Sequence, residues 1–243
     1  MVHARVMLLL LALAPLATAG ETATVALGRM LRKARDAGAL DRILEERNYL
    51  RTWNDSFDAV VTTRGKRLED GSGISFEVVT DVRNLKPRLE REMVVVLFDG
   101  RLRKLVMEVR EGGKTRKGEA ELQEGKATDL EIRSDDGAAQ KVKLKPNANS
   151  LPSSVLRFLL PTLHDQGLPA ELPFGYLDGS PALGRLQHEG AEITIVDRPQ
   201  QPPQDHYRIR VGEGKLIEAS HRQHKLTAIT PEEAKRRLAA KQE

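Results

Sequence analysis

The chain has 243 residues, with 39 lysines and arginines against 35 aspartates and glutamates, and it contains no cysteine. Its 40% of hydrophobic and 30% of charged residues are typical of a folded domain, which excludes a disordered chain and one embedded in a membrane. The lack of cysteine excludes a disulfide scaffold, a thiolate zinc site, an iron–sulfur cluster and a catalytic thiol.

The first residues have the pattern of a secretory signal. A basic start with His3 and Arg5 precedes the apolar stretch 7–16, and Ala17-Thr18-Ala19 offers the small residues that signal peptidase accepts. The apolar stretch is shorter than the roughly 20 residues that cross a hydrocarbon core. We therefore predict a signal peptide over residues 1–19 that is cleaved after Ala19, with a retained anchor as the alternative.

This signal predicts a periplasmic or secreted protein whose mature chain has no transmembrane anchor. No cysteine follows the cleavage region, which excludes the usual lipid-anchored route. The absence of disulfides fits a Gram-negative periplasm. Because no dense basic run is interleaved with aromatic residues, we predict no nucleic-acid partner.

The segment 20–50 is predicted to be helical. Its apolar residues recur with helical spacing, and Gly38 is expected to divide it into two helices. The residues that carry this pattern are Leu27, Met30, Leu31 and Ala34, and then Leu40, Ile43 and Leu44.

From residue 51 to residue 230 the period changes from 3.6 to 2, which predicts an antiparallel β domain. An acidic residue followed by glycine recurs between the alternating runs, and such pairs favour tight hairpins because glycine tolerates a positive φ. The pairs are Asp70-Gly71, Asp99-Gly100, Glu111-Gly112, Glu124-Gly125, Asp136-Gly137, Asp178-Gly179, Glu189-Gly190 and Glu213-Gly214. We expect a mainly β (α+β) fold: a meander of about eleven to thirteen strands, too many for a flat sheet, that curls into an unclosed β-barrel.

Two helices are expected within or after this sheet. The insert near residues 152–165 is apolar nearly all round, so it should be buried against the concave face of the sheet. It is either solid filler or a lid over a ligand cavity, and the residues that would line such a cavity are Val155, Leu156, Phe158, Leu159 and Leu160. The capping box Thr230-Pro231-Glu232-Glu233 predicts a C-terminal helix over residues 231–243.

Candidate chemistry is sparse. His221 and His224 lie close in sequence, but on one strand a spacing of three places them on opposite faces, so one metal could bind both only across a turn or bulge. His164-Asp165 and Asp205-His206 are sequence neighbours without a catalytic signature. No nucleophile elbow, zinc-protease motif, dinucleotide fingerprint or phosphate loop is present. We predict no catalytic residue, no metal site and no cofactor.

Three lysines, Lys141, Lys143 and Lys145, alternate with Val142 and Leu144 and share one strand face. They form either a basic stripe for anionic lipid headgroups or envelope polymers, or a solvated face that discourages edge pairing.

An N-terminal helix, a long antiparallel meander, one apolar insert and the run Gly214 to Glu218 together resemble the periplasmic lipoprotein-carrier type of unclosed β-barrel. They also resemble uncharacterised bacterial envelope proteins that share this sheet. In the carrier family a half-barrel covered by helices shields lipid chains in transit. The resemblance therefore implies lipid or lipoprotein acyl chains as partners.

The leading hypothesis is an exported, non-catalytic binding or carrier protein for a hydrophobic or lipid-linked ligand in the cell envelope. One alternative is an envelope structural or protein-interaction module with a solid core. Another is a hydrolase that uses a His/Asp pair.

Overall fold

The computed structural model describes residues 21–84, 86–179, 184–198 and 200–240. The predicted signal peptide, residues 1–19, lies outside the described residues. Among the residues described, no helix is both long and apolar enough to cross a bilayer.

A single antiparallel sheet dominates the described chain. Its first meander contains β1 (Arg47–Trp53), β2 (Ser56–Arg67), β3 (Gly73–Val82), β4 (Arg88–Leu97), β5 (Leu102–Glu111), β6 (Lys114–Glu121), β7 (Thr128–Ser134) and β8 (Ala139–Leu144). Its second meander contains β9 (Glu171–Phe174), β10 (Gly184–Glu189), β11 (Glu192–Val196), β12 (Tyr207–Gly212), β13 (Lys215–His221) and β14 (His224–Ile229). The strands within each meander pair with their chain neighbours.

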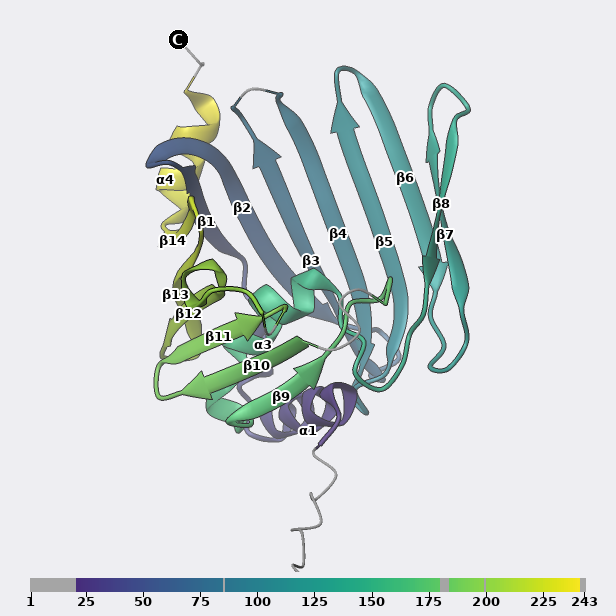
Figure 1. The fold of residues 1–243 in the computed structure, drawn as a ribbon, viewed down its shortest axis with the longest axis vertical. Helices are drawn as coiled ribbons and strands as arrows, with labels where there is room; N and C mark the ends of the chain where they lie inside the picture. The colour runs from purple at the N-terminus through teal and green to yellow at the C-terminus, as the bar shows by residue number, and fades with distance from the viewer. Residues whose placement is uncertain (1–20, 85, 180–183, 199, 241–243) are drawn as a thin grey trace, which may run out of the picture.

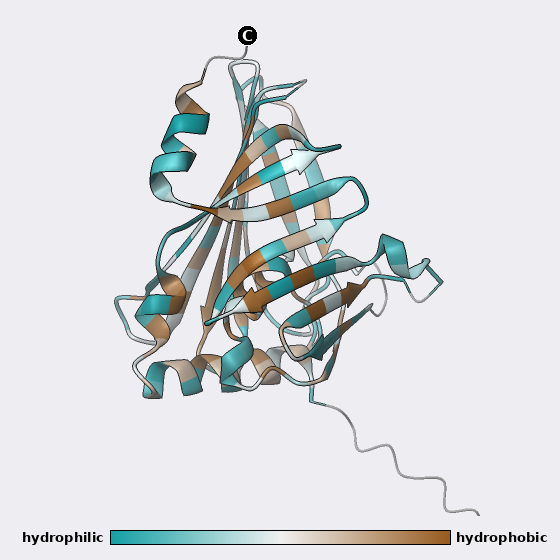
Figure 2. Ribbon diagram, turned by 90° about the vertical axis from the view of Figure 1, so that its left-hand side faces the viewer, coloured by the Kyte–Doolittle hydropathy of each residue, from teal (hydrophilic) through white to brown (hydrophobic). Residues whose placement is uncertain are grey.

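The two meanders are joined by antiparallel pairing of β1 with β14, so the described sheet has 14 strands in the order β8 to β1 and then β14 to β9. β8 and β9 are its two edges. The predicted mainly β fold, a curled and unclosed antiparallel meander with helices at both ends, is confirmed. Figure 1 shows the long strands β2–β6 side by side, with β7 and β8 beyond them and the shorter strands β9–β11 crossing in front, and Figure 2 shows the same arrangement from the side.

The glycines of all eight acidic–glycine pairs lie outside the strands and have a positive φ, and Glu111 and Glu189 are the last residues of β5 and β10. Two turns that carry no glycine were missed by the sequence analysis: Asn54 and Asp55 both have positive φ between β1 and β2, and Arg222 does so between β13 and β14. The positive φ of these residues performs the role that glycine has elsewhere.

The N-terminal region contains α1 (Ala23–Asp36) and α2 (Leu40–Leu44), separated at Gly38 as expected. β1 begins at Arg47, so the helical segment is shorter than the predicted 20–50. The reason is tertiary pairing: residues of β1 pair with β2 on one side and with β14 on the other, and Tyr49 is only 1% exposed.

The insert connects the two edges of the sheet and consists of η1, one π-helical turn (Val155–Leu159), α3 (Leu160–Thr162) and the 3-10 turn η2 (His164–Gln166). Pro161 has no N–H to donate to the Arg157 carbonyl, which disfavours a regular α-helix at this point. A further 3-10 turn, η3 (Pro203–Asp205), precedes β12. The chain then ends in α4 (Pro231–Ala239), whose N-cap Thr230 accepts a hydrogen bond from the Glu233 amide at 3.2 Å.

The face of β3–β5 that points away from the insert is polar but well covered. Glu77 and Glu108 are only 7% and 6% exposed. Glu77 forms ion pairs with Arg64, at 2.5 Å, and with Arg91. Burial raises the pKa of the Glu77 carboxyl, but these two arginines outweigh it, so the pKa is lowered overall.

Candidate functional site

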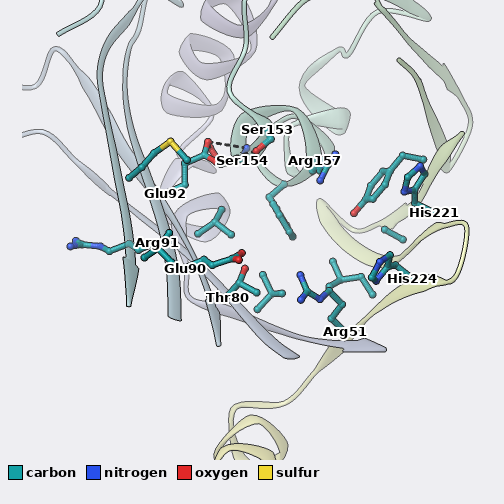
Figure 3. Close-up of a pocket in the computed structure, with 18 of the residues that line it drawn as sticks. Arg51, Thr80, Glu90, Arg91, Glu92, Ser153, Ser154, Arg157, His221 and His224 are labelled. Atoms are coloured by element: carbon teal, nitrogen blue, oxygen red, sulfur yellow. Dashed lines mark hydrogen bonds between the residues drawn. The ribbon is translucent and has the colours of Figure 1, made fainter. Parts of the chain in front are cut away.

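A cleft of about 600 Å³ lies between the concave face of the sheet and the helical insert. Strands of both meanders contribute to it, because the β1–β14 junction brings β13 and β14 beside β1 and β2. Figure 3 shows side chains from β3 and β4 at one end of the cleft and those from β13 and β14 at the other.

The floor of the cleft is apolar. The side chains that form it come from alternate, inward-facing positions of β2, β3, β5, β13 and β14. They are Val61, Val78, Met107, Val109, Ala219 and Leu226. A floor of this kind excludes water from a bound apolar group and gives little directional specificity.

The five predicted cavity residues divide into two groups. Val155, Leu156, Leu159 and Leu160 are fully buried in the hydrophobic core and do not line the cleft. Phe158 is half-buried, lines the cleft and lies with its ring 5.8 Å from that of Tyr49. The insert is therefore mainly core filler, and one of its sides faces the cleft.

That side of the insert is polar, which the apolar pattern of the sequence did not reveal. Ser153, Ser154 and Arg157 line the cleft beside Phe158. The Glu92 carboxylate on β4 accepts hydrogen bonds from the Ser153 hydroxyl at 3.0 Å and from the Ser154 hydroxyl at 2.6 Å. These contacts fix the start of the insert against the long strands (Figure 3).

Arg157 is held over an aromatic surface. Its guanidinium carbon lies 5.1 Å from the centre of the Tyr207 ring, and its buried Nε has no hydrogen-bond partner among the described residues. The Tyr176 hydroxyl donates to the Asp197 carboxylate at 3.0 Å. Burial raises the pKa of Tyr176 to about 12, so this hydroxyl keeps its proton at neutral pH.

His221 and His224 lie on the same side of the sheet, which the sequence analysis allowed only if a turn or bulge separated them. They are register partners at the end of the β13–β14 hairpin, and both line the cleft. The chain reverses its direction in the turn at Arg222, so the two histidines lie on neighbouring strands rather than on one continuous strand. Burial and the nearby Arg157 lower the pKa of His221 below its usual value of 6.5.

The other histidine candidates form local contacts. His164 Nε2 lies 2.8 Å from Asp165 Oδ1, and His164 Nδ1 lies 3.2 Å from the Pro161 carbonyl oxygen. Both ring nitrogens are thus engaged within the insert, whereas a general base needs one nitrogen directed at a nucleophile. Within the described ranges, no group of three or more histidine or acidic side chains could hold a metal ion.

The lysines of the predicted basic stripe are exposed. Lys141 and Lys143 lie on the edge strand β8, and Lys145 follows that strand. None of them lines the cleft. Lysine on an edge strand opposes pairing with another chain, and a role in binding anionic surfaces stays a prediction.

No protein-family model matches the sequence, and a comparison with curated proteins finds no match. Among solved structures, the chain is similar to a beta-barrel-like protein of the domain of unknown function DUF1849 from Brucella abortus. The two share 11% sequence identity, the match covers 76% of this chain and 95% of that chain, and the TM-score is 0.43. We draw no functional argument from a likeness of this size.

Proposed function

We propose that the protein is an exported, non-catalytic binding or carrier protein whose cleft holds a hydrophobic or lipid-linked molecule in the cell envelope. The observation that carries the proposal is the cleft of about 600 Å³ with an apolar floor beneath the insert. Small-molecule sites have volumes of about 300–1,000 Å³ and are lined mainly by apolar side chains.

The cleft favours this role over a structural module with a solid core. Apolar side chains such as Met107 and Val109 would be packed at native density if the interior were only a core. Both are instead half-buried and face the cleft. A bound acyl chain would cover them and gain the free energy of apolar burial.

The proposal is tested by extracting the purified protein with organic solvent, analysing the extract by mass spectrometry, and titrating the protein with a fluorescent fatty acid. We expect a co-purified lipid or saturable binding of the probe. Absence of both would refute the proposal.

A matched pair of variants assigns the binding to the cleft. Met107 on β5 lines the cleft, and it pairs in register with Glu92. Met93 follows Glu92 on β4 and therefore faces the opposite side of the sheet, and both methionines are half-buried. Met107→Trp fills the cleft and should abolish binding of the probe, whereas Met93→Trp should leave it unchanged. Equal effects of the two variants would place the binding elsewhere.

The envelope location is tested separately. Cell fractionation and N-terminal sequencing of the natively expressed protein should find it in the periplasm or medium with Gly20 as its first residue. A cytoplasmic protein that begins at Met1 would contradict the export.

A further inference from the structure

The cleft has two sides of opposite charge. Arg51, Arg157, His221, His224 and Lys225 line it on the side of β1, β13, β14 and the insert. Glu90, Glu92 and Glu108 line it on the side of β4 and β5, together with Arg91, whose guanidinium pairs with Glu77 and Glu108. Figure 3 shows the labelled members of both groups. A ligand of uniform polarity would not need such a separation.

Most of these charges are already satisfied by the protein. Glu92 accepts hydrogen bonds from the hydroxyls of Ser153 and Ser154, and Glu90 pairs with Arg88 at 2.5 Å. On the other side, Asp58 pairs with Arg51 at 2.5 Å, and Glu218 pairs with Lys225 at 3.1 Å. The groups that remain for a ligand are Arg157, His221 and His224.

Of these three side chains, Arg157 has a buried hydrogen-bond donor that lacks an acceptor in the part of the chain that the structure describes. Its Nε is buried without an acceptor among the described residues, and a buried donor without a partner costs free energy. Tyr176 is hydrogen-bonded to the guanidinium, and Asp197, which accepts a hydrogen bond from the Tyr176 hydroxyl at 3.0 Å, acts on it electrostatically, so Nε is the nitrogen that the described contacts leave without an acceptor. The guanidinium is held in place by the Tyr207 ring, so an anion that enters the cleft meets a pre-oriented donor.

The two histidines lie beside Arg157 in the cleft, and we call these three residues the cationic corner. The His221 ring lies 5.9 Å from that of Tyr207, and the His224 ring stacks on Trp53 at 6.3 Å. Because the pair sits across one hairpin register position, two imidazoles can donate to the same bound group. An imidazole can donate a hydrogen bond from a ring nitrogen whether or not it carries a charge, so both histidines add donors to that of Arg157.

Resting on the proposed function, we infer that the ligand carries an anionic headgroup, a carboxylate or a phosphate monoester, that binds at Arg157, His221 and His224. Its apolar chain extends over the floor formed by Met107, Val109 and Val78. The apolar surface supplies most of the affinity, and the cationic corner selects the headgroup and the orientation of the chain.

The test compares three probes with the same chain: oleate, oleyl phosphate and the neutral oleyl alcohol. Competition against a fluorescent fatty acid reports the affinity of each. We expect at least one anionic probe to bind about tenfold more tightly than oleyl alcohol, which is the size of one hydrogen bond to a charged group. The better of the two anions identifies the headgroup chemistry.

Arg157→Gln should lower the affinity for the preferred anion about tenfold and leave that for oleyl alcohol unchanged. Arg208→Gln is the matched control: Arg208 follows Tyr207 on β12, is exposed, and donates to the Pro203 carbonyl at 3.4 Å outside the cleft. It should bind all three probes as the wild type does. If circular dichroism shows that Arg157→Gln does not fold, the double variant His221→Gln/His224→Gln is used in its place. It should likewise lose affinity for the preferred anion and bind oleyl alcohol as the wild type does.

The results separate the two proposals. Equal binding of anionic and neutral probes would overturn the headgroup site and leave the binding function intact. If Arg157→Gln and His221→Gln/His224→Gln fold and still prefer the anionic probes, the headgroup does not bind at these residues, which would also overturn the headgroup site. Binding of none of the probes would instead contradict the proposed function.

Discussion

Gly100 approaches Thr24 so closely that a Cβ atom on Gly100 would lie 1.7 Å from the Thr24 carbonyl oxygen. Gly100 belongs to the β4–β5 turn and Thr24 to the first turn of α1, so this contact seats the helix on the end of the sheet. Glycine is required at position 100 for a second reason, because the residue there has a φ of +91°.

Gly100→Ala should therefore be far more damaging than alanine at an equivalent turn. Gly137 has a φ of +84°, but a Cβ atom there would meet nothing within 4 Å. We expect Gly137→Ala to cost about 1 kcal/mol of unfolding free energy from backbone strain alone. Gly100→Ala should cost more than about 4 kcal/mol, because α1 must shift. Urea unfolding measures both, and equal losses would contradict the packing.

The two serines at the start of the insert give a second matched pair. Ser154 is 2% exposed and donates to Glu92 at 2.6 Å, whereas Ser153 is half-buried and donates to the same carboxylate at 3.0 Å. Ser154→Ala should lower the free energy of unfolding by about 1–2 kcal/mol, and Ser153→Ala by less. Thermal unfolding of the two variants decides the order, and a larger loss for Ser153→Ala would refute it.

The covered polar face should show a carboxylate pH dependence. Because the pKa of Glu77 is lowered from its usual 4.5, its ion pairs contribute stability above that pH, which is lost as the pH falls through the lower folded-state value. Glu77→Gln should cost about 1–2 kcal/mol at pH 7, because Arg64 and Arg91 each lose their shorter ion pair, keep only the longer ones to Glu46 and Glu108, and are themselves partly exposed.

The exposed Glu119 on β6, which pairs with Lys104 at 3.1 Å, is the control for Glu77. Glu119→Gln should change the unfolding free energy by less than about 1 kcal/mol. Unfolding measured from pH 7 to pH 3 should show the wild type and Glu77→Gln converging in acid. If the difference in unfolding free energy between the wild type and Glu77→Gln stayed constant over this pH range, ionisation of Glu77 would be excluded as its cause.

His221 should make the protein less stable in mild acid. Since its folded-state pKa is lowered from 6.5, the unfolded chain takes up a proton more readily, and stability falls as the pH drops below about 6.5. The groups that act on it are Arg157 from the insert, Arg222 in the turn, His224 on β14, and Asp197, which opposes the other three.

NMR titration of the His221 ring checks this directly. The wild type should titrate below 6.5, and Arg157→Gln should raise the pKa because it removes a nearby positive charge. A His221 pKa above 6.5 in the wild type, or one that Arg157→Gln does not move, would contradict the account.

Local patterns predicted the strands and turns well, because each depends on a few neighbouring residues. The acidic–glycine pairs marked turns since glycine alone takes a positive φ without strain. β1 was missed because its stability comes from two distant strands, β2 and β14, that no local period records. The same pairing joins the two meanders, so the order of the sheet was equally invisible in the sequence.

The candidate site was predicted only in part. Phe158 was expected to face a cavity and does line the cleft, whereas Arg157 beside it was not among the predicted site residues. The turn that brings His221 and His224 to one side was left open rather than predicted, because Arg222 gives no turn signal comparable to glycine. Which charges are left without partners depends on ion pairs across strands, such as Arg51–Asp58, and Asp58 lies at a β-bulge between β1 and β2 that no local period records.

The central claim is that an apolar chain occupies the cleft over Met107, and NMR of protein labelled with ¹³C at the methionine methyl groups tests it most directly. On titration with oleate, the Met107 methyl signal should shift to saturation, while that of Met93, on the opposite side of the sheet, should stay in place. A shift of Met93 without Met107, or no shift of either at saturating oleate, would contradict the claim.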